Sequence, residues 1–245
     1  TLCLYTEEDL RKGLVTREVV LDEEEHRTGD VWHVGIHGMS RAMGSGSGSE
    51  YFYGYRLQGP DVDALAHVDP HGLTYDETAV VLDPYAKSVY NGRRAFGALN
   101  EAGGSQYETT WPQAVALVPS AEDAFDWEGD APLELPIEDL VLYEAHVRGF
   151  TADPSSKVTK EKVGTYAGLT ERLNYLEYLG INAIELLPVY EFNELEYYQV
   201  ASTDFNRYNY WGYSTVGFFA PMARYAEGMA DESLDAVAAS RAVVK

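Results

Sequence analysis

The chain has 245 residues, enough for one large domain or two of ordinary size. Its formal net charge is −22, because 40 acidic residues stand against 18 basic ones. This balance argues against nucleic acid or an anionic membrane surface as a partner, since both need a positive patch. The simplest interpretation of the acidity is solubility, and the expected partner is neutral or cationic.

Cysteine usage and hydropathy limit the cellular compartments in which the protein is expected. The single cysteine, Cys3, excludes an internal disulfide, fits a reducing compartment and is expected in the core. No run of about 18 apolar residues predicts a membrane span, and residues 1–10 lack the pattern of a signal peptide. No transit peptide is visible. Because the chain has no initiator Met, a targeting sequence upstream of Thr1 remains an open alternative.

The first 60 residues predict an antiparallel β-sandwich. Residues 1–5 are mostly apolar from the first positions, which predicts a strand whose beginning is missing from the sequence. Residues 18–21, 31–36 and 51–57 are further short strand candidates, separated by polar or glycine-rich turns. In the stretch 31–36, the alternation of apolar and polar residues predicts a half-buried strand.

Two sets of side chains in this region have competing interpretations. His33 and His37 share a strand face, but no third ligand lies at a useful spacing, so metal binding is not favoured. Tyr51, Tyr53 and Tyr55 also share a face and would suit a sugar-stacking platform. A packed sheet face is the preferred interpretation of these tyrosines. Residues 61–136 have a weaker pattern and are expected to be connecting structure.

Residues 140–189 predict a strand–helix–strand unit. The stretch 140–147 is a short apolar run broken by Glu144 and His146. Leucines at helical spacing follow between residues 168 and 180, Gly180 stands where a glycine would end the helix, and residues 181–189 form a second apolar run. Such a crossover is what two buried parallel strands need, so the pattern favours an α/β fold.

The same region carries a family resemblance. It contains YEAHVRGFT, then INAIELLPV, then NYWGYSTVGFFAPMARYA, and the likeness extends back through YGYRLQGP, VLDPYAKSV and LCLYTEEDL. Together these resemble isoamylase-type starch debranching enzymes, as in plants and algae, within glycoside hydrolase family 13 of the α-amylase superfamily. The resemblance covers most of the chain.

The resemblance implies a multidomain fold. Residues 1–90 would be an N-terminally truncated, immunoglobulin-like β-sandwich of the carbohydrate-binding-module type, and residues 91–137 a connecting segment. Residues 138–245 would open a (β/α)₈ TIM barrel. Because such a barrel typically needs about 250 residues, the barrel would be incomplete.

Glycoside hydrolysis needs two carboxylates that flank the scissile bond. Glu144 and Glu185 lie in the two strand candidates and, with His146, would permit an enzyme hypothesis from this chain alone. The resemblance instead places the catalytic Asp, Glu and Asp after later barrel strands, beyond Lys245. We therefore expect no catalytic residue here and interpret these three side chains as a buried polar network.

An aromatic cluster is the candidate substrate contact. It consists of Tyr208, Tyr210, Trp211 and Tyr213, with Gly212 allowing a close backbone approach. In the family pattern, the tyrosine after the glycine lies under the sugar at the cleavage point, and Tyr213 matches it. Core packing is the alternative, but the polar residues of the same stretch favour substrate contact.

The resemblance implies hydrolysis of α-1,6 branch linkages in starch-like or glycogen-like glucans, with no cofactor and no metal within this chain. The expected partner is a branched α-glucan such as amylopectin, together with homo- or hetero-oligomers of debranching subunits, in the plastid stroma. The main alternative is a non-catalytic glucan-binding or regulatory subunit of a debranching complex. A structural interaction module without glucan affinity is the third hypothesis.

Overall fold

The computed structural model describes residues 1–37, 51–59, 78–90, 114–118, 127–194 and 209–226. The chain divides into two units, the first made of residues 1–86 and 99–118, the second of residues 87–98 and 119–245. In the parts described, no helix is long and apolar enough to cross a membrane.

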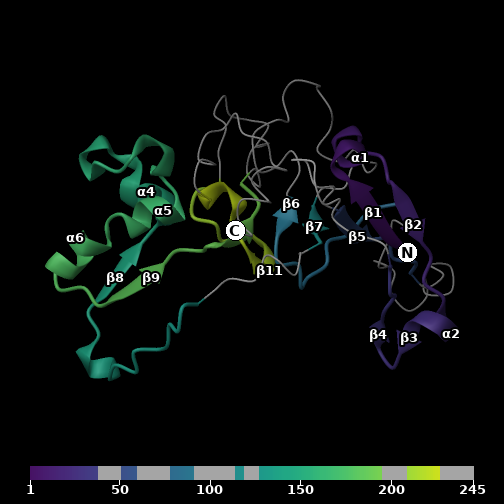
Figure 1. Cartoon of the computed structure of the whole chain (residues 1–245), viewed down its shortest axis with the longest axis horizontal. Helices are drawn as coiled ribbons and strands as arrows, with labels where there is room; N and C mark the ends of the chain where they lie inside the picture. The colour runs from purple at the N-terminus through teal and green to yellow at the C-terminus, as the bar shows by residue number, and fades with distance from the viewer. Residues whose placement is uncertain (38–50, 60–77, 91–113, 119–126, 195–208, 227–245) are drawn as a thin grey trace, which may run out of the picture. The chain divides into compact units, whose positions relative to one another are not determined.

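The first unit contains an antiparallel sheet in the order β2-β1-β5-β7 (Figure 1). Its strands are β1 (Leu2–Thr6), β2 (Arg17–Val19), β5 (Tyr51–Tyr55) and β7 (Val115–Leu117). The strands predicted at residues 1–5, 18–21 and 51–57 are therefore confirmed, with shifted ends. Cys3 pairs with Gly54 in the β1–β5 register and is fully buried beside Tyr5 and Phe52, which confirms its core position.

Smaller elements complete this unit. They are α1 (Glu7–Lys12), α2 (Glu23–His26), and the hairpin of β3 (Arg27–Thr28) and β4 (Val31–Trp32). The strand predicted over residues 31–36 is too long, because the pairing of β3 with β4 stops after Trp32. Trp32 is exposed, so the predicted half-buried face does not form there. Among the described residues of this unit, a second sandwich layer is not seen, and the sandwich stays a prediction.

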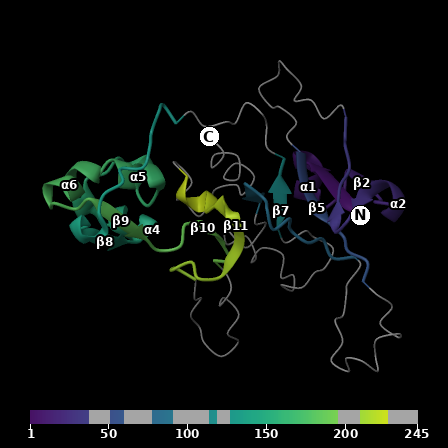
Figure 2. The ribbon, with the colours of Figure 1, turned by 90° about the horizontal axis from the view of Figure 1, so that it is seen from below.

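The second unit contains the predicted strand–helix–strand arrangement (Figure 2). Strands β8 (Leu142–Ala145) and β9 (Ala183–Leu186) pair in parallel, and the helices between them are α4 (Val147–Ala152), α5 (Tyr166–Thr170) and α6 (Leu173–Tyr178). Short 3₁₀ turns lie at η4 (Ile137–Asp139), η5 (Pro154–Ser156) and η6 (Lys160–Lys162). The parallel pairing is confirmed, whereas the first strand is shorter than predicted because Val147 already begins α4.

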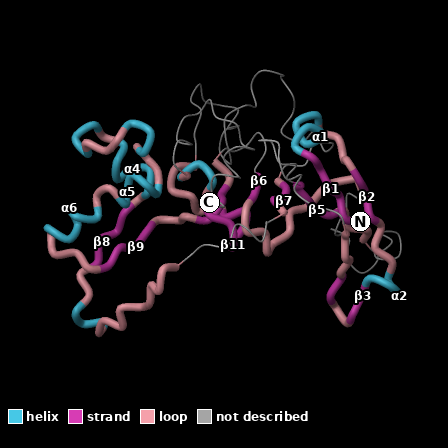
Figure 3. The backbone as a smooth tube through the Cα atoms, in the orientation of Figure 1, coloured by secondary structure: helices cyan, strands magenta, loops and turns pink. Residues whose placement is uncertain are grey.

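The single helix predicted over residues 168–180 is wrong in its continuity. Arg172 has φ −109° and ψ 6°, which leaves the helical region and separates α5 from α6, as the colours of Figure 3 show. Leu169 and Leu176 are buried, but Leu173 and Leu179 are exposed. The predicted end is confirmed, because Gly180 has φ 81° and its N–H bonds to the carbonyl of Glu177.

A second antiparallel pair carries the candidate site. It consists of β10 (Tyr190–Phe192) and β11 (Thr215–Pro221), followed by the 3₁₀ turn η7 (Ala223–Tyr225), and the same unit contains the short strand β6 (Val89–Tyr90). Buried beside this pair are Val147, Phe192, Met222 and Tyr225, with Tyr166 and Val189 packed against them. This cluster joins the start of α4 to β10 and η7.

Candidate functional site

The loop before β11 presents aromatic side chains to solvent. Tyr210 is 43% exposed, Trp211 63% and Tyr213 70%. The rings of Trp211 and Tyr213 are neighbours, with centroids 6.4 Å apart and planes inclined by 58°. We call Tyr210, Trp211 and Tyr213 the aromatic face. Tyr208, the fourth residue of the predicted cluster, lies outside the described residues.

The backbone of this loop turns at Gly212, which has φ 87°. Its N–H donates a hydrogen bond of 3.0 Å to Oδ1 of Asn209, whose own N–H donates to the carbonyl of Glu194. A Cβ at position 212 would lie 2.9 Å from ring carbons of Phe192. The predicted close approach at Gly212 is thus made to a buried aromatic ring of β10, and only glycine suits both the conformation and the space.

His146 holds the loop from the other side. Its imidazole stacks on the Tyr210 ring with centroids 4.3 Å apart and planes 9° apart. Its Nε2 lies 2.7 Å from the carbonyl oxygen of Tyr210, and its Nδ1 lies 3.0 Å from the backbone nitrogen of Gly149. Since the Gly149 N–H can only donate, Nδ1 accepts, and the ring proton belongs on Nε2. The neutral tautomer therefore satisfies both bonds.

The surroundings of His146 favour this neutral form. Burial lowers the pKa of the imidazole below its ordinary value of 6.5, the Tyr210 carbonyl opposes this effect, and the Arg148 guanidinium adds to it. The Tyr225 hydroxyl lies 3.4 Å from Nε2, and its ring meets the imidazole edge at a centroid distance of 5.9 Å. Burial also raises the pKa of Tyr225, which keeps the phenol neutral.

Buried polar contacts hold the turn that carries Tyr225. Oε2 of Glu191 accepts a hydrogen bond of 2.9 Å from the N–H of Ala223, and Oε2 of Glu194 accepts one of 2.6 Å from Nε of Arg224. All three of these charged side chains are buried. They tie β10 to η7 and so support the cluster on which Gly212 and His146 rest.

Glu144 and Glu185 do not form the predicted buried network. They stand opposite one another in the β8–β9 register, and both are exposed, because described residues do not cover the face of the pair that carries them. His146 is half-buried and bonds to Tyr210 instead. No group of three or more His, Cys, Asp or Glu in the described ranges could hold a metal ion, and His33 and His37 are exposed.

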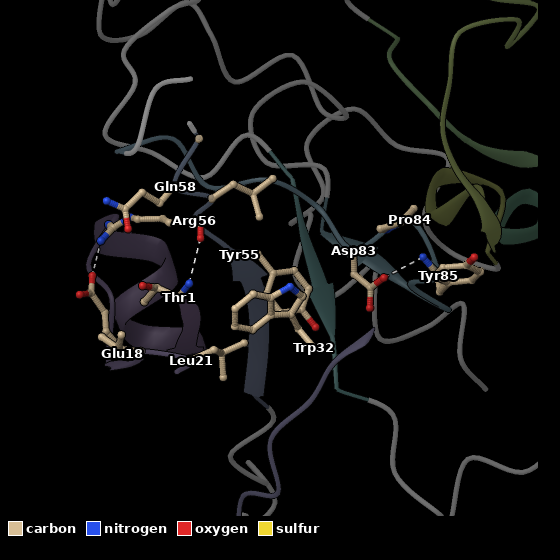
Figure 4. A pocket seen from close by; sticks show the side chains of 13 residues that line it. Thr1, Glu18, Leu21, Trp32, Tyr55, Arg56, Gln58, Asp83, Pro84 and Tyr85 are labelled. Atoms are coloured by element: carbon tan, nitrogen blue, oxygen red, sulfur yellow. Dashed lines mark hydrogen bonds and ion pairs between the residues drawn. The ribbon is translucent and has the colours of Figure 1, made fainter. Parts of the chain in front are cut away.

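The first unit has a concave surface of its own. A pocket of about 900 Å³ is lined by Trp32, Tyr55 and Tyr85 together with charged side chains (Figure 4). Arg56 pairs with Glu18 at one end, and Oδ1 of Asp83 accepts a hydrogen bond of 2.8 Å from the N–H of Tyr85. The packed face preferred for the tyrosines fits in part, since Tyr53 is half-buried and donates to Asp83 at 2.7 Å.

Known proteins have sequences similar to this one. No protein-family model matches the chain. Isoamylase 1, chloroplastic, from Arabidopsis thaliana is 47% identical over 227 residues, which are 92% of this chain and 26% of the relative. Isoamylase SU1, chloroplastic, from Zea mays is 44% identical over 246 residues, covering 100% of this chain and 28% of the relative. The chain is therefore similar to isoamylases of plants.

The match is to one part of these isoamylases, because the chain spans about a quarter of their length. A solved structure of apo pullulanase from Paenibacillus barengoltzii resembles it with a TM-score of 0.57 at 23% identity. That likeness covers 96% of this chain and 30% of the pullulanase. At this identity the likeness concerns the fold alone. It is consistent with the sheets described above.

Sequence reasoning found the aromatic residues but not what holds them. The predicted aromatic residues do lie together, namely Tyr210, Trp211 and Tyr213. Glu144 and Glu185 are not part of the site. His146 contacts Tyr210 rather than joining the predicted network with Glu144 and Glu185, and no sequence pattern singles out Phe192. The available signal was local: His146 stands three residues before Gly149 at the end of an apolar run, which suits the cap of a helix beginning at Val147.

Proposed function

We propose that the protein containing this chain is an isoamylase, which hydrolyses α-1,6-glucosidic branch linkages of starch-like or glycogen-like glucans. The observation that supports this proposal is the exposed aromatic face, in which Tyr213 is the residue that by resemblance matches the family's sugar platform. Aromatic rings offer sugars an apolar surface, and Tyr adds a hydroxyl for hydrogen bonding. Exposure of Trp211 and Tyr213 supports substrate contact over core packing.

The proposed architecture is an immunoglobulin-like β-sandwich over residues 1–90, a connecting segment over 91–137, and the opening of a (β/α)₈ barrel over 138–245. The antiparallel sheet of the first unit and the parallel β8–β9 pair with intervening helices support it. In such barrels the loops after the strands build the active site. His146 directly follows β8, and the aromatic face lies in a segment that follows β9, as this architecture requires.

The proposed reaction is a retaining double displacement, in which a carboxylate attacks the sugar and a second carboxyl group protonates the leaving oxygen. The resemblance puts the catalytic Asp, Glu and Asp outside this chain. The residues of this chain would bind and orient. Tyr213 would lie beneath the sugar at the branch, and Trp211 would contact the neighbouring ring or the same sugar from the side.

The proposed partner is a branched, uncharged α-glucan, to which the net charge of −22 presents no obstacle because the sugar carries none. We place the protein in the plastid stroma, since the Arabidopsis and maize relatives carry chloroplastic in their names. Assembly with other debranching subunits belongs to the same proposal and has its own test, the elution volume of the full-length protein.

Glucan contact is tested by retardation of the chain in native gels that contain amylopectin. Trp211→Ala with Tyr213→Ala should abolish most of the retardation. Trp127 and Tyr178 are 66% and 86% exposed, so Trp127→Ala and Tyr178→Ala are matched controls that should migrate like wild type. Trp32→Ala probes the pocket of the first unit. Retardation that depends on Trp32 and not on the aromatic face would overturn the proposed contact.

Debranching is tested with the full-length protein. Incubation with amylopectin should release linear chains and new reducing ends. A protein that binds amylopectin and releases nothing would be the non-catalytic subunit, and absence of both binding and hydrolysis would leave a structural interaction module. Each result decides among the three functions named from the sequence.

A further inference from the structure

His146 links the first strand of the β8–β9 pair to the aromatic face. It lies 64 positions before Tyr210 in the sequence, yet it contacts both the ring and the carbonyl of that residue. The carbonyl belongs to the peptide unit that leads into Trp211. A side chain that fixes this peptide fixes the direction in which the following residues leave it.

We propose that His146 is a positioning residue that sets the orientation of Trp211 and Tyr213 for glucan binding through its contacts with Tyr210. The inference rests on the function proposed above for the aromatic face. His146 itself is half-buried beneath the Tyr210 ring, so it acts through that residue.

A second hydrogen bond, at the opposite side of the imidazole, fixes the position of the ring. Nδ1 accepts the N–H of Gly149 in the first turn of α4, so the ring is held at two points in one plane. The Tyr210 hydroxyl lies over the same turn, because a Cβ on Gly149 would be 3.1 Å from it. Tyr210 therefore contacts both the imidazole and the first turn of α4, while part of its ring stays exposed.

Two nearby groups bear on the protonation of the ring. Among the described residues, Arg148 on α4 and Tyr225 on η7 face it besides Tyr210, and Glu194 and Arg224 act in turn on Tyr225. The guanidinium carbon of Arg148 lies 5.9 Å from the centroid of the Tyr210 ring. A cation beside the imidazole disfavours a second positive charge, which keeps Nδ1 free to accept.

A purely structural role is the competing interpretation, because His146 also caps α4. The two nitrogens allow the roles to be separated. In His146→Asn, the side-chain oxygen can replace Nδ1 as acceptor for Gly149, but nothing reaches the Tyr210 carbonyl. In His146→Gln, the side-chain N–H can reach that carbonyl, while the cap is lost.

The experiment measures three quantities on the chain: melting temperature, the Trp211 indole N–H signal in a ¹H–¹⁵N spectrum without ligand, and the dissociation constant for maltoheptaose. His146→Asn should melt like wild type, shift the indole signal and bind about three- to tenfold more weakly, the range of one neutral hydrogen bond. His146→Gln should melt lower, yet keep the indole signal and affinity closer to wild type.

A third variant tests the contact of Tyr210 with the Gly149 turn while leaving His146 in place. Gly149→Ala adds a methyl group beside the Tyr210 hydroxyl at a helical position, where alanine favours the helix. It should move the indole signal and weaken binding without lowering the melting temperature. An indole signal unchanged in both His146→Asn and Gly149→Ala would overturn the positioning role.

The outcome also separates this inference from the function on which it rests. If wild type fails to bind maltoheptaose but the indole signal moves as described, glucan contact fails and the positioning of the loop stands. If wild type binds and His146→Asn binds equally well, the positioning role fails and glucan contact stands. Loss of affinity in proportion to melting temperature across all variants would leave His146 as a helix cap only.

Discussion

Oε2 of Glu194 lies 2.6 Å from Nε of Arg224, and the two side chains are only 7% and 5% exposed. Taking two charges out of water is costly, and their attraction repays this cost only while both are present. The pair joins the segment that follows β10 to η7, which carries Tyr225 of the buried cluster.

Glu194→Gln should therefore destabilise the second unit strongly. It removes the carboxylate charge from beside the buried Arg224 guanidinium, and breaking a buried ion pair in this way typically costs about 3–5 kcal/mol. Urea unfolding followed by far-UV circular dichroism measures the loss. Glu177→Gln, at an exposed position of the same unit, is the matched control and should change the midpoint by almost nothing. Equal midpoints for the two variants would contradict the importance of the pair.

Gly212→Ala should destabilise the loop before β11 for two reasons, its positive φ and its contact with Phe192. Gly180→Ala separates them, because Gly180 has φ 81° with nothing within 4 Å of an added Cβ, whereas Gly212 has φ 87° with ring carbons 2.9 Å away. We expect about 1 kcal/mol for Gly180→Ala and about 1–3 kcal/mol more for Gly212→Ala. Urea midpoints give the difference, and equal losses would show that Phe192 accommodates the methyl group.

Tyr213→Ala should reduce activity without reducing stability, since 70% of the side chain is exposed. In the full-length enzyme, we expect kcat/KM for amylopectin to fall about 10²-fold, roughly 2.7 kcal/mol of transition-state stabilisation, because the sugar loses its platform. Tyr213→Phe keeps the stacking ring and should cost much less. Melting temperature and kcat/KM are measured on the same preparation. A lower melting temperature with unchanged kinetics would assign Tyr213 to packing instead.

The His146 cap should make the second unit sensitive to mild acid. The folded-state pKa is lowered, so the unfolded chain takes up the proton first as the pH falls. The stabilising contribution is complete above about pH 6.5, the ordinary pKa of histidine, and declines from there down to the lowered folded value. Below the folded value the Gly149 N–H loses its acceptor.

The measurement is amide hydrogen exchange of Gly149 between pH 7.5 and pH 5, corrected for the intrinsic rate. Protection should decline across this window in wild type and stay level in His146→Asn, whose amide oxygen does not titrate. A wild-type decline that persists in His146→Asn would assign the sensitivity to another group.

Local patterns predicted much of the fold. Apolar runs located β1, β5, β8 and β9, and Gly180 marked the end of α6 because a left-handed residue favours glycine. The aromatic face was also predictable, since Trp211 and Tyr213 stand among polar residues that disfavour burial. In each case the deciding interaction is between residues near in sequence, or is burial averaged over a face.

The tertiary structure decided what periodicity cannot express. Leucine spacing predicts one helix, but Arg172 leaves the helical conformation and only Leu169 and Leu176 become buried. Glu144 and Glu185 are exposed, because described residues do not cover the face of the β8–β9 pair that carries them. Sequence periodicity does not show which segments will cover a given face. His146 meets Tyr210 across 64 positions of chain, and Gly212 meets Phe192 in the same way. Such contacts depend on the path of the backbone through space, because the sequence specifies which groups can bond but only the folded chain brings distant groups within bonding distance.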